Sequence, residues 1–377
     1  MPKAKKSAQT EPVEPGAVAA EELVAQFPAV DLPIRPPYPP MEAKSVDDIP
    51  QGQSWIYEPK WDGFRCVAFR DGDTVVMQSK AGQPLDRYFP EMVDALRQLP
   101  ARRFVLDGEI VIEQHGHLSF DDLLMRIHPA ASRIKKLSQA TPSTYLVFDM
   151  LVDQDGKSLT ALTLTQRRKH LEDFAGKLPR GGSIRLSPST YSREQAVRWM
   201  TELASAGFDG VIAKIGDMPY ASGERTGMRK IKRIRTADCV VGGFRYASKG
   251  DQVGSLLLGL YDDEGLLNHC GFTSSFNAEK RAELKKILKP YTDGEGFSGR
   301  APGGPSRWST ERSGEWERLD PQLVVEVQYD HFSGDRFRHG TKFLRWRPDK
   351  KPKQCTFEQV RPARKGRGVL AKLMEAA

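Results

Sequence analysis

Between residues 55 and 235, apolar and polar positions change their spacing from segment to segment, which predicts strands alternating with helices. Apolar runs at residues 66–70 and 74–79 flank Asp71-Gly72-Asp73, a pattern typical of a β-hairpin. Residues 88–99 carry apolar side chains at helical spacing. Further strands are predicted at residues 55–57, 104–112, 144–152, 209–214 and 229–234, and further helices at residues 120–127, 164–174 and 194–206. We therefore expect an α+β domain.

Three of these strands contain residues that disturb their pattern. Pro59 should end the first strand, because proline has no N–H to donate to a sheet ladder. Asp107-Gly108-Glu109 should interrupt the strand over residues 104–112. Residues 229–234 alternate basic and apolar side chains, as an edge strand facing an anion would. Charge thus enters strands that should otherwise be apolar.

A different pattern follows residue 236. Strands are predicted at residues 239–245, 254–261, 266–272, 323–329 and 342–347, with one helix at residues 278–288. Five strands and one helix in about a hundred residues suit a small closed β-barrel of the OB-fold type. Residues 294–318 are rich in Gly, Ser and Arg, so we expect a long, mobile loop there.

These patterns divide the chain into four parts. Residues 1–28 have little apolar content and predict a disordered tail, with room for one short helix at residues 18–27. Residues 29–235 form the first domain, which a proline-rich stretch enters in an extended conformation. Residues 236–357 form the barrel, and residues 358–377 form a basic tail.

Composition narrows the class of protein. The 377 residues have a formal net charge of +8, which favours a polyanionic partner, although basic surfaces also serve solubility alone. Four cysteines without a C-x-x-C pair and seven histidines without ligand spacing support neither a zinc site nor a disulfide framework. No apolar run is long enough for a membrane span and no secretory signal is visible, so we expect a soluble cytoplasmic protein.

The stretch from Lys60 to Arg65, Lys-Trp-Asp-Gly-Phe-Arg, is the first candidate for chemistry. A lysine amine attacks phosphorus only when it is neutral, and burial or neighbouring cations favour that form. Gly63 allows close approach to a ligand, and Arg65 offers a fork of donors to phosphate or sugar. Taken alone, the stretch is better interpreted as a charged turn between strands, until other elements are added.

Five further elements place charge in or beside a predicted strand. They are Ser79-Lys80, Asp107-Gly108-Glu109, Phe148-Asp149, Asp209-Gly210-Val211-Ile212-Ala213-Lys214 and Lys230-Ile231-Lys232. Any one of them could simply face water. Because ionised groups are rarely buried without a partner, the whole set favours convergence on one polar pocket.

In this order, the six elements resemble motifs I, Ia, III, IIIa, IV and V of the covalent nucleotidyltransferases, which include ATP-dependent DNA ligases, RNA ligases and mRNA capping enzymes. Residues 32–357 more specifically resemble the bacterial C-type ATP-dependent DNA ligases, through the stretches 57–65, 87–91, 126–129, 236–241 and 345–349. The resemblance implies an ATP-grasp-like nucleotidyltransferase domain of antiparallel sheets with flanking helices, followed by an OB-fold barrel.

The resemblance also implies a role for each motif residue. Lys60 would attack the α-phosphate of ATP and hold AMP, and Asp209, with Glu109, would hold a divalent metal, Mg or Mn. The expected nucleotide-binding residues are Glu58 near the adenine, Phe148 stacked on it, and Arg65 and Glu109 at the ribose. Lys230 and Lys232 would bind the α-phosphate, and Lys80, Lys214 and, in a motif VI of the barrel, Arg347 and Lys350 complete the set.

Two positions depart from the family pattern. Motif IV usually has Glu where this chain has Asp209, so a metal would lie closer to the strand or bind through water. Motif Ia usually has Arg where this chain has Lys80. A 5′-phosphate would therefore be bound by the compact ammonium charge of Lys80 instead of by the planar set of guanidinium donors. Neither change removes a required charge.

The resemblance implies an ATP-dependent DNA ligase that seals nicks in duplex DNA during repair, as a monomer at the bacterial nucleoid. A repair polymerase or an end-binding protein is the partner that such a role implies. DNA contacts are expected from basic barrel residues that could equally be solvated surface: Arg245, Lys249, Arg307, Arg312, Arg336 and Arg338. One alternative is an RNA ligase or a capping-type enzyme, which a preference for GTP over ATP or for RNA ends over DNA ends would reveal. A second alternative is a non-catalytic nucleic-acid-binding module, but the presence of Lys60, Glu109 and Lys232 argues against it.

Overall fold

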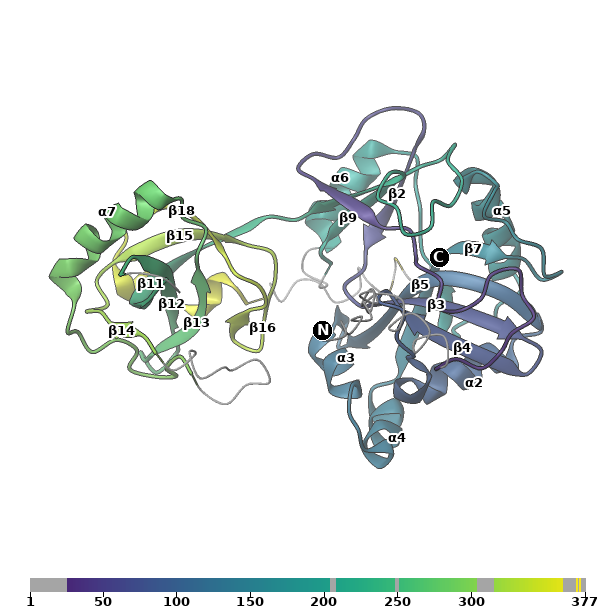
Figure 1. Cartoon of the computed structure of the whole chain (residues 1–377), viewed down its shortest axis with the longest axis horizontal. Helices are drawn as coiled ribbons and strands as arrows, with labels where there is room; N and C mark the ends of the chain where they lie inside the picture. The colour runs from purple at the N-terminus through teal and green to yellow at the C-terminus, as the bar shows by residue number, and fades with distance from the viewer. Residues whose placement is uncertain are drawn as a thin grey trace, which may run out of the picture. The chain divides into compact units, whose positions relative to one another are not determined.

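Two compact units make up the chain in the computed structural model (Figure 1). The structure describes residues 26–203, 208–247, 251–303 and 315–361, together with Ala371 and Leu373. Unit 1 contains residues 26–203 and 211–231, and unit 2 contains residues 208–210 and 232–361. Most of the two predicted tails, the end of the helix expected at 194–206 and the centre of the expected mobile loop lie outside the described residues.

A six-stranded sheet forms the main scaffold of unit 1. Its order is β4-β3-β5-β7-β8, with β6 paired to β5, and every pairing is antiparallel except that of β7 with β8. The strands are β3 (Phe64–Asp71), β4 (Thr74–Ser79), β5 (Arg103–Gln114), β6 (His117–Leu118), β7 (Ser143–Val152) and β8 (Ile184–Leu186). The predicted hairpin is confirmed by the β3–β4 ladder, which closes at Asp71 opposite Thr74.

The interruption predicted in β5 does not occur. Asp107, Gly108 and Glu109 all pair with β3, and only a register shift against β7 marks the triplet. Gly108 is required because a Cβ there would lie 2.6 Å from the carbonyl oxygen of Leu146. The strand therefore continues and presents its charged residues from inside the sheet.

A four-stranded sheet in the order β1-β10-β9-β2 completes the strands of unit 1. Its members are β1 (Ala43–Val46), β2 (Trp55–Lys60), β9 (Gly210–Ile215) and β10 (Met228–Lys232). The predicted edge position of residues 229–234 is wrong, since β10 lies between β1 and β9. Pro59 does not end β2 either, because β2 is the last strand of this sheet and an edge strand tolerates proline.

Helices bury the apolar faces of these strands. They are α2 (Pro90–Gln98), α3 (Phe120–Arg126), α4 (Ala131–Ala140), α5 (Leu164–Ala175) and α6 (Arg193–Glu202), with a short 3-10 turn η1 (Asp86–Tyr88). Met92 and Leu96 of α2 and Phe174 of α5 share one core with Phe104 of β5. The helix α4 was not predicted, because Ile134 is its one buried residue and its apolar pattern is correspondingly weak.

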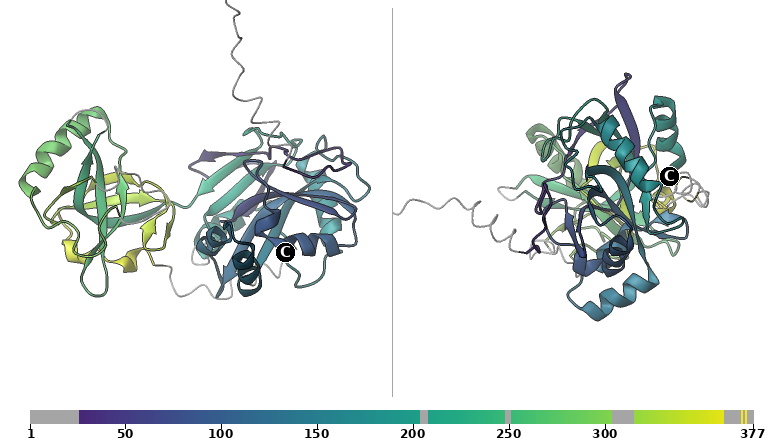
Figure 2. Two further views of the ribbon diagram at one scale, coloured as in Figure 1. Left: turned by 60° about the horizontal axis from the view of Figure 1, so that its bottom comes forward. Right: turned by 90° about the vertical axis from the view of Figure 1, so that its right-hand side faces the viewer.

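Unit 2 is the expected barrel. Its main sheet runs β13-β12-β11-β15-β18, with β14 paired to β11, and a bridge between Thr273 and Thr341 joins the two ends. In Figure 2 these strands, coloured green to yellow, curl around one another. The elements are β11 (Arg235–Tyr246), β12 (Val253–Tyr261), β13 (Leu267–Thr273), α7 (Ala278–Leu288), η3 (Lys289–Tyr291), β14 (Glu317–Arg318), β15 (Val324–Tyr329), β16 (Phe332–Ser333), β17 (Arg336–Phe337), β18 (Lys342–Trp346), η5 (Pro352–Gln354) and η6 (Phe357–Gln359).

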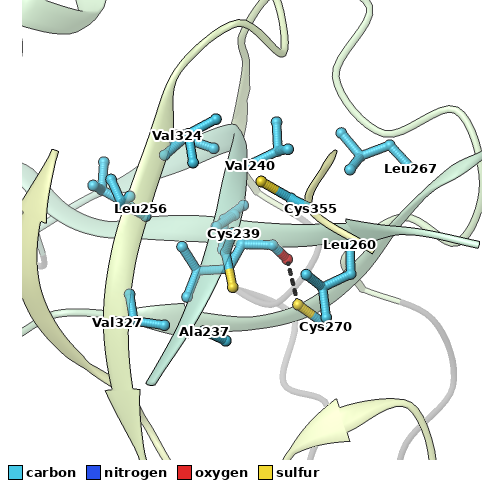
Figure 3. Packing of buried hydrophobic residues seen from close by; sticks show 14 of the residues in the cluster. Ala237, Cys239, Val240, Leu256, Leu260, Leu267, Cys270, Val324, Val327 and Cys355 are labelled. Atoms are coloured by element: carbon cyan, nitrogen blue, oxygen red, sulfur yellow. Dashed lines mark hydrogen bonds between the residues drawn. The ribbon is translucent and has the colours of Figure 1, made fainter. Parts of the chain in front are cut away.

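The core of unit 2 is apolar and contains three of the four cysteines. Cys239, Cys270 and Cys355 are buried and reduced among Val, Leu and Phe side chains (Figure 3). The thiol of Cys270 donates to the carbonyl oxygen of Leu258 over 3.4 Å. Burial raises the pKa of the Cys239 and Cys355 thiols, so these side chains act as small apolar residues. The predicted fold class, an α+β domain followed by an OB-fold barrel, is confirmed.

No helix in the described part of the chain is long and apolar enough to cross a bilayer.

Candidate active site

A cavity of about 230 Å³ opens in unit 1 between the two sheets, and its walls come from the ends of several strands. Eight of the predicted site residues line it: Glu58, Lys60, Arg65, Lys80, Glu109, Phe148, Lys214 and Lys230. They come from β2, β3, β5, β7, β9 and β10 and from the turn after β4. The predicted convergence of charged strand residues on one pocket therefore occurs.

Glu58 and Lys214 form a buried ion pair in the wall of the cavity. The Nζ atom of Lys214 lies 2.8 Å from a carboxylate oxygen of Glu58, and both side chains are at most 4% exposed. Burial lowers the pKa of Lys214, while the charge of Glu58 opposes that effect. The pair places a fixed carboxylate and a fixed ammonium side by side.

Two cations lie over the aromatic ring of Phe148. The Nζ atom of Lys214 is 4.3 Å from the centre of the Phe148 ring, and the guanidinium carbon of Arg65 is 4.6 Å from it. Lys214 also donates to the carbonyl oxygen of Phe148 over 3.4 Å. These cation–π contacts hold the ring in one orientation at the cavity wall.

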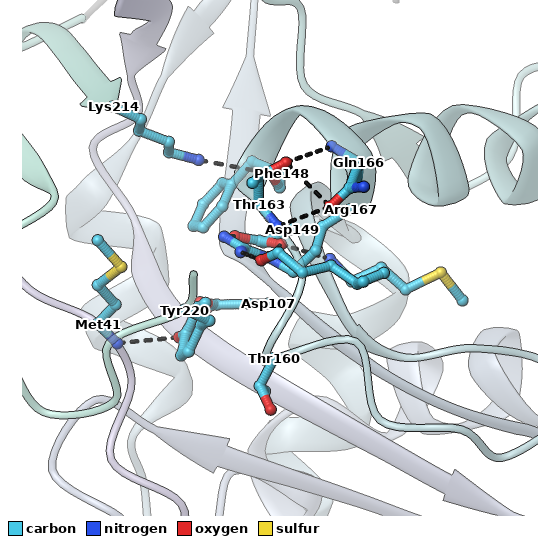
Figure 4. Close-up of polar contacts among 12 residues, drawn as sticks. Met41, Asp107, Phe148, Asp149, Thr160, Thr163, Gln166, Arg167, Lys214 and Tyr220 are labelled. Atoms are coloured by element: carbon cyan, nitrogen blue, oxygen red, sulfur yellow. Dashed lines mark hydrogen bonds and ion pairs between the residues drawn. The ribbon is translucent and has the colours of Figure 1, made fainter. Parts of the chain in front are cut away.

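Arg65 is anchored by a second buried carboxylate. Its guanidinium donates to both oxygens of Asp107, over 2.5 and 2.6 Å, and to the carbonyl oxygen of Met41 over 3.3 Å. The hydroxyl of Tyr220 donates to Asp107 over 2.6 Å and accepts from the N–H of Met41 over 2.9 Å (Figure 4). Although burial acts in the opposite direction, Asp107 raises the pKa of Arg65, which therefore stays charged.

Asp149 extends the support beneath Phe148. It receives both donors of the Arg167 fork, over 2.8 and 2.9 Å, from the first turns of α5 (Figure 4). Arg167 also donates to the carbonyl oxygen of Leu162 over 2.7 Å. Since Asp149 follows Phe148 in β7, this pair ties the strand to the helix and keeps the aromatic ring in place.

Glu109 faces the cavity beside the expected nucleophile. Burial raises its pKa to about 7, and the charges of Arg65 and Lys60 oppose that shift. The N–H of Gly63 donates to its carboxylate over 3.2 Å. A Cβ on Gly63 would lie 2.2 Å from the carbonyl oxygen of Ile110, so only glycine allows this approach. The carboxyl group changes protonation near neutral pH.

Lys80 lies at the more exposed rim of the cavity. Its ammonium pairs with Glu42 over 3.0 Å, and Arg225 reaches the same carboxylate. A hydrogen bond from Lys80 lowers the pKa of Glu42, although desolvation acts against it. An exposed cation held by a shared acidic partner can exchange that partner for a phosphate group at little cost.

Comparisons with known proteins show which family the chain belongs to. Residues 40–232 match the family described as the ATP dependent DNA ligase domain, and residues 249–350 match the ATP dependent DNA ligase C terminal region. DNA ligase C1 of Mycolicibacterium smegmatis is 43% identical over 341 residues, which cover 88% of this chain and 96% of that protein. DNA ligase C of Mycobacterium tuberculosis is 42% identical over 346 residues, with the same two coverages.

The chain belongs to the ATP-dependent DNA ligases.

Within that family the similarity is to the bacterial C type, as the sequence predicts. The end-joining protein LigD of Mycolicibacterium smegmatis is 29% identical over 313 residues, which cover 82% of this ligase and 38% of that protein. A solved Lig E DNA ligase shares the fold, with a TM-score of 0.52 and 16% identity over 82% of this chain and 98% of its own.

The remaining predicted residues of the ligase belong to unit 2. Lys232, at the end of β10, pairs with Asp330 over 2.7 Å, and His339 contacts the same carboxylate over 3.0 Å. An oxygen of Asp209 lies 3.6 Å from a ring nitrogen of His331. Each of these predicted charges therefore has an ionisable neighbour within its own unit.

Motif VI of the ligase centres on a residue that the sequence did not single out. Asp238 in β11 accepts from Arg347 over 2.8 Å and from Lys350 over 2.7 Å. Asp349 also pairs with Arg347 over 2.7 Å, and this hydrogen bond lowers the pKa of Asp349 to about 2. Asp238 thus fixes both motif VI cations from a neighbouring strand.

Sequence reasoning missed the residues that support the site. Asp107 and Asp149 belong to the motif elements Asp107-Gly108-Glu109 and Phe148-Asp149. Their position within these charged elements was a signal that could have identified them as supports of the site. Arg167 and Tyr220 carry no local signal, because an arginine in a helix and a tyrosine in a loop are ordinary surface residues. Only the fold brings them to within 3 Å of those carboxylates.

Proposed function

We propose that this ligase seals nicks in duplex DNA through three phosphoryl transfers that begin at Lys60. The Nζ atom of Lys60 forms a bond to the α-phosphorus of ATP while the bond to pyrophosphate breaks. A 5′-phosphate oxygen at the nick then takes AMP from Lys60. The 3′-hydroxyl finally attacks the 5′-phosphorus, a phosphodiester forms and AMP leaves. The single observation that carries this proposal is the gathering of Lys60 and seven further motif residues around one cavity.

The fixed side chains of the cavity would orient the bound nucleotide. Phe148, whose ring contacts Arg65 and Lys214, lines the cavity and would stack on the adenine. The carboxylate of Glu58 is oriented by Lys214 and would select the adenine edge. Such pre-set groups lower the entropy cost of bringing the α-phosphate to the amine.

The cations and Glu109 would act on the phosphate and the ribose. Lys230 lines the cavity and would offset the charge that develops on the α-phosphate, the role that the family motif implies for Lys232 as well. Glu109 and Arg65 would hold the ribose hydroxyls.

A divalent cation, Mg²⁺ or Mn²⁺, suits this set of donors. Glu109 is a carboxylate whose burial raises its pKa, and a bound cation would favour its ionised form. Asp209 would supply a second oxygen, as the motif implies. When bound, the ion would polarise phosphate oxygens and neutralise their charge.

The wider role follows from the type of ligase. The similarity to the end-joining protein LigD supports work in DNA repair. A repair polymerase or an end-binding protein would be its partner there. We assign residues 29–235 to the adenylyltransferase domain and residues 236–357 to the barrel. The protein would act as a monomer at the nucleoid.

Labelled ATP tests the first transfer. Wild-type protein should form a radioactive band on a denaturing gel, and Lys60→Ala should abolish it. Lys44→Ala, at an exposed position of β1, is the matched control and should retain the band. A band that persists in Lys60→Ala would remove Lys60 from its role.

Substrate choice separates this proposal from its alternatives. Nicked duplex DNA with ATP should be sealed, whereas GTP or nicked RNA should support little reaction. A preference for GTP or for RNA ends would favour a capping-type enzyme or an RNA ligase. Absence of any labelled band together with DNA binding would indicate a non-catalytic module.

A further inference from the structure

A second, much smaller cavity lies beside the large one in unit 1. Its volume is about 10 Å³, against about 230 Å³ for the cavity that Lys60 lines. Among the described residues, three line both cavities: Met41, Lys214 and Met228. These three side chains therefore form a wall between the two spaces. Because Lys214 is fixed by its buried ion pair with Glu58, the two methionines are the part of the wall that limits the depth of the large cavity.

Met41 is held in the wall through its backbone, so its side chain is the part that can move. Its N–H donates to the hydroxyl of Tyr220 over 2.9 Å (Figure 4), and its carbonyl oxygen accepts from Arg65 over 3.3 Å. Met228 lies in β10 opposite Ala43 of β1. Both methionine side chains are almost completely buried. An unbranched thioether adapts to the space around it, so these two residues can close the boundary of a cavity tightly.

Gly227 leaves room for the end of the Met41 side chain. A Cβ atom on Gly227 would lie 2.2 Å from the terminal methyl carbon of Met41 and 3.5 Å from the sulfur of Met218. Gly227 and Met218 line the small cavity and not the large one, whereas Met41 lines both. A methyl group at position 227 would therefore push the end of Met41 toward the large cavity. The φ angle of Gly227 lies outside the left-handed region, so its backbone also suits alanine.

The wall lies next to the side chains that would hold the base of ATP. Lys214, one of its members, pairs with Glu58 over 2.8 Å and lies 4.3 Å from the centre of the Phe148 ring. A carboxylate is an acceptor, and the N6 amino group is a donor on the edge of adenine. With the base stacked on Phe148 and its amino group at Glu58, a substituent on that amino group would extend along Lys214 toward the methionines.

We propose that Met41 and Met228 determine the nucleotide specificity of the ligase by limiting the size of the group that the base carries at N6. This inference rests on the proposed function, in which Lys60 takes AMP from ATP. The unsubstituted amino group of ATP fits in front of the wall. An N6-alkylated ATP keeps one N–H for Glu58 but places its alkyl group against two closely packed thioethers, which exclude it. Removal of one methionine side chain joins the two cavities and admits the group.

Competition between two nucleotides in one reaction tests the wall. Full-length protein receives Mg²⁺ and equal concentrations of ATP and N6-benzyl-ATP in excess, and intact-mass spectrometry measures how much protein carries each adduct. Inorganic pyrophosphatase keeps the transfer irreversible. Because both nucleotides compete for the same enzyme, the ratio of the two adducts equals the ratio of their kcat/KM values. Misfolded protein forms neither adduct, so it does not affect this ratio.

We expect wild-type protein to carry almost exclusively AMP. Met41→Ala should raise the share of the N6-benzyl-AMP adduct about tenfold, because the benzyl group enters the joined space. Met228→Ala opens the other half of the wall and should act in the same direction, which keeps the test decisive if Met41→Ala does not fold. Met218→Ala is the matched control, since Met218 lines the small cavity and not the large one, and its ratio should equal that of wild type.

Gly227→Ala should have the opposite effect. The competitor here is N6-methyl-ATP, whose smaller substituent we expect wild-type protein to accept in part. The displaced end of Met41 should lower the share of the methylated adduct severalfold. Gly227→Ala combined with Met41→Ala should lose this effect, because the side chain that the new methyl group displaces is gone. An undiminished effect in the double variant would show that position 227 does not act through Met41 and would contradict the proposal.

The outcomes separate this inference from the proposed function. If wild-type protein forms no adduct with ATP, the proposed function fails. If wild-type protein forms the AMP adduct but Met41→Ala, Met228→Ala and Gly227→Ala all keep the wild-type ratios, the methionines do not set the specificity. An equal rise in Met218→Ala and Met41→Ala would also overturn the inference, because a general loosening of unit 1 would then explain both results.

Discussion

The two units hold their motif charges in different ways. In unit 1, Asp107 and Asp149 are almost completely buried and each receives a bidentate arginine. In unit 2, the side chains of Lys232 and Asp330 are 32% and 25% exposed. Breaking a buried pair leaves an uncompensated charge, whereas an exposed pair exchanges its partner for water or ligand cheaply. Unit 1 thus holds these charges rigidly around the proposed nucleotide site, whereas the pair of Lys232 and Asp330 in unit 2 can be exchanged at lower cost.

The largest effect on stability should come from the pair that is buried deepest at the cavity. We expect Glu58→Gln to lower the free energy of unfolding by about 3 kcal/mol, because Lys214 then lacks its buried counter-charge. Urea denaturation measures the loss. Glu326→Gln, which breaks an exposed pair with Arg345, should change the midpoint little. Equal losses in both variants would remove the difference between the units.

A double variant sharpens this result. Glu58→Leu combined with Lys214→Met replaces the pair by apolar groups and should recover most of the stability that Glu58→Gln loses. The same protein should form little labelled Lys60–AMP, because the two polar groups of the pocket are gone. Recovery of both stability and labelling would show that the pair serves packing alone.

Loss of one hydroxyl beneath the site should have a smaller effect. Tyr220→Phe removes a donor to Asp107 and an acceptor for the N–H of Met41, so we expect a loss of about 1–2 kcal/mol. Arg65 would be less firmly held, and the KM for ATP in the adenylation assay should rise more than kcat falls. Tyr191→Phe, at a side chain that is 62% exposed, is the control and should change neither quantity.

The pH dependence of stability should report on Glu109. Its folded pKa of about 7 lies above its usual value of 4.5, so the folded protein keeps a proton that the unfolded chain releases. The contribution of this group is fully present below pH 4.5 and is lost as pH rises through about 7. Because Glu109 faces the open cavity, where solvent screens its charge, we expect the free energy of unfolding to fall by only about 1 kcal/mol over this pH range.

Comparison of wild-type protein with Glu109→Gln isolates that loss. Urea denaturation of the ligand-free proteins at pH 5 and pH 8 should show a smaller decline for the variant. Asp86, whose pKa burial raises to about 6, contributes with the same sign but is present in both proteins, so it cancels in the difference. Identical declines would contradict a raised pKa at Glu109.

The smallest change in stability is expected in unit 2. Asp238→Asn removes the shared acceptor of Arg347 and Lys350, yet the urea midpoint should remain close to that of wild type because both cations can turn to water. Adenylation of Lys60 should slow severalfold, since the motif VI cations lose their orientation. A large fall in the midpoint with unchanged adenylation would give Asp238 a structural role instead.

The local patterns predicted most elements, and their failures have clear physical causes. The hairpin of β3 and β4, the strand β7 and the helix α7 follow from apolar spacing and turn residues alone. The helix α4 was missed because it buries little, and β10 was misplaced at an edge because sheet order depends on distant strands. Eight of the predicted site residues line the cavity, because the ordered motifs along the chain identify the residues that the reaction requires.

The sequence by itself determined the fold class, the family and the amine expected to bond to phosphorus, because each depends on residue types at short spacing. Only the tertiary structure decided which carboxylate holds which cation. Asp107 lies 42 positions from Arg65 and 113 positions from Tyr220 along the chain. Partners so far apart meet only when the strands pair and the core packs, and no local spacing records that.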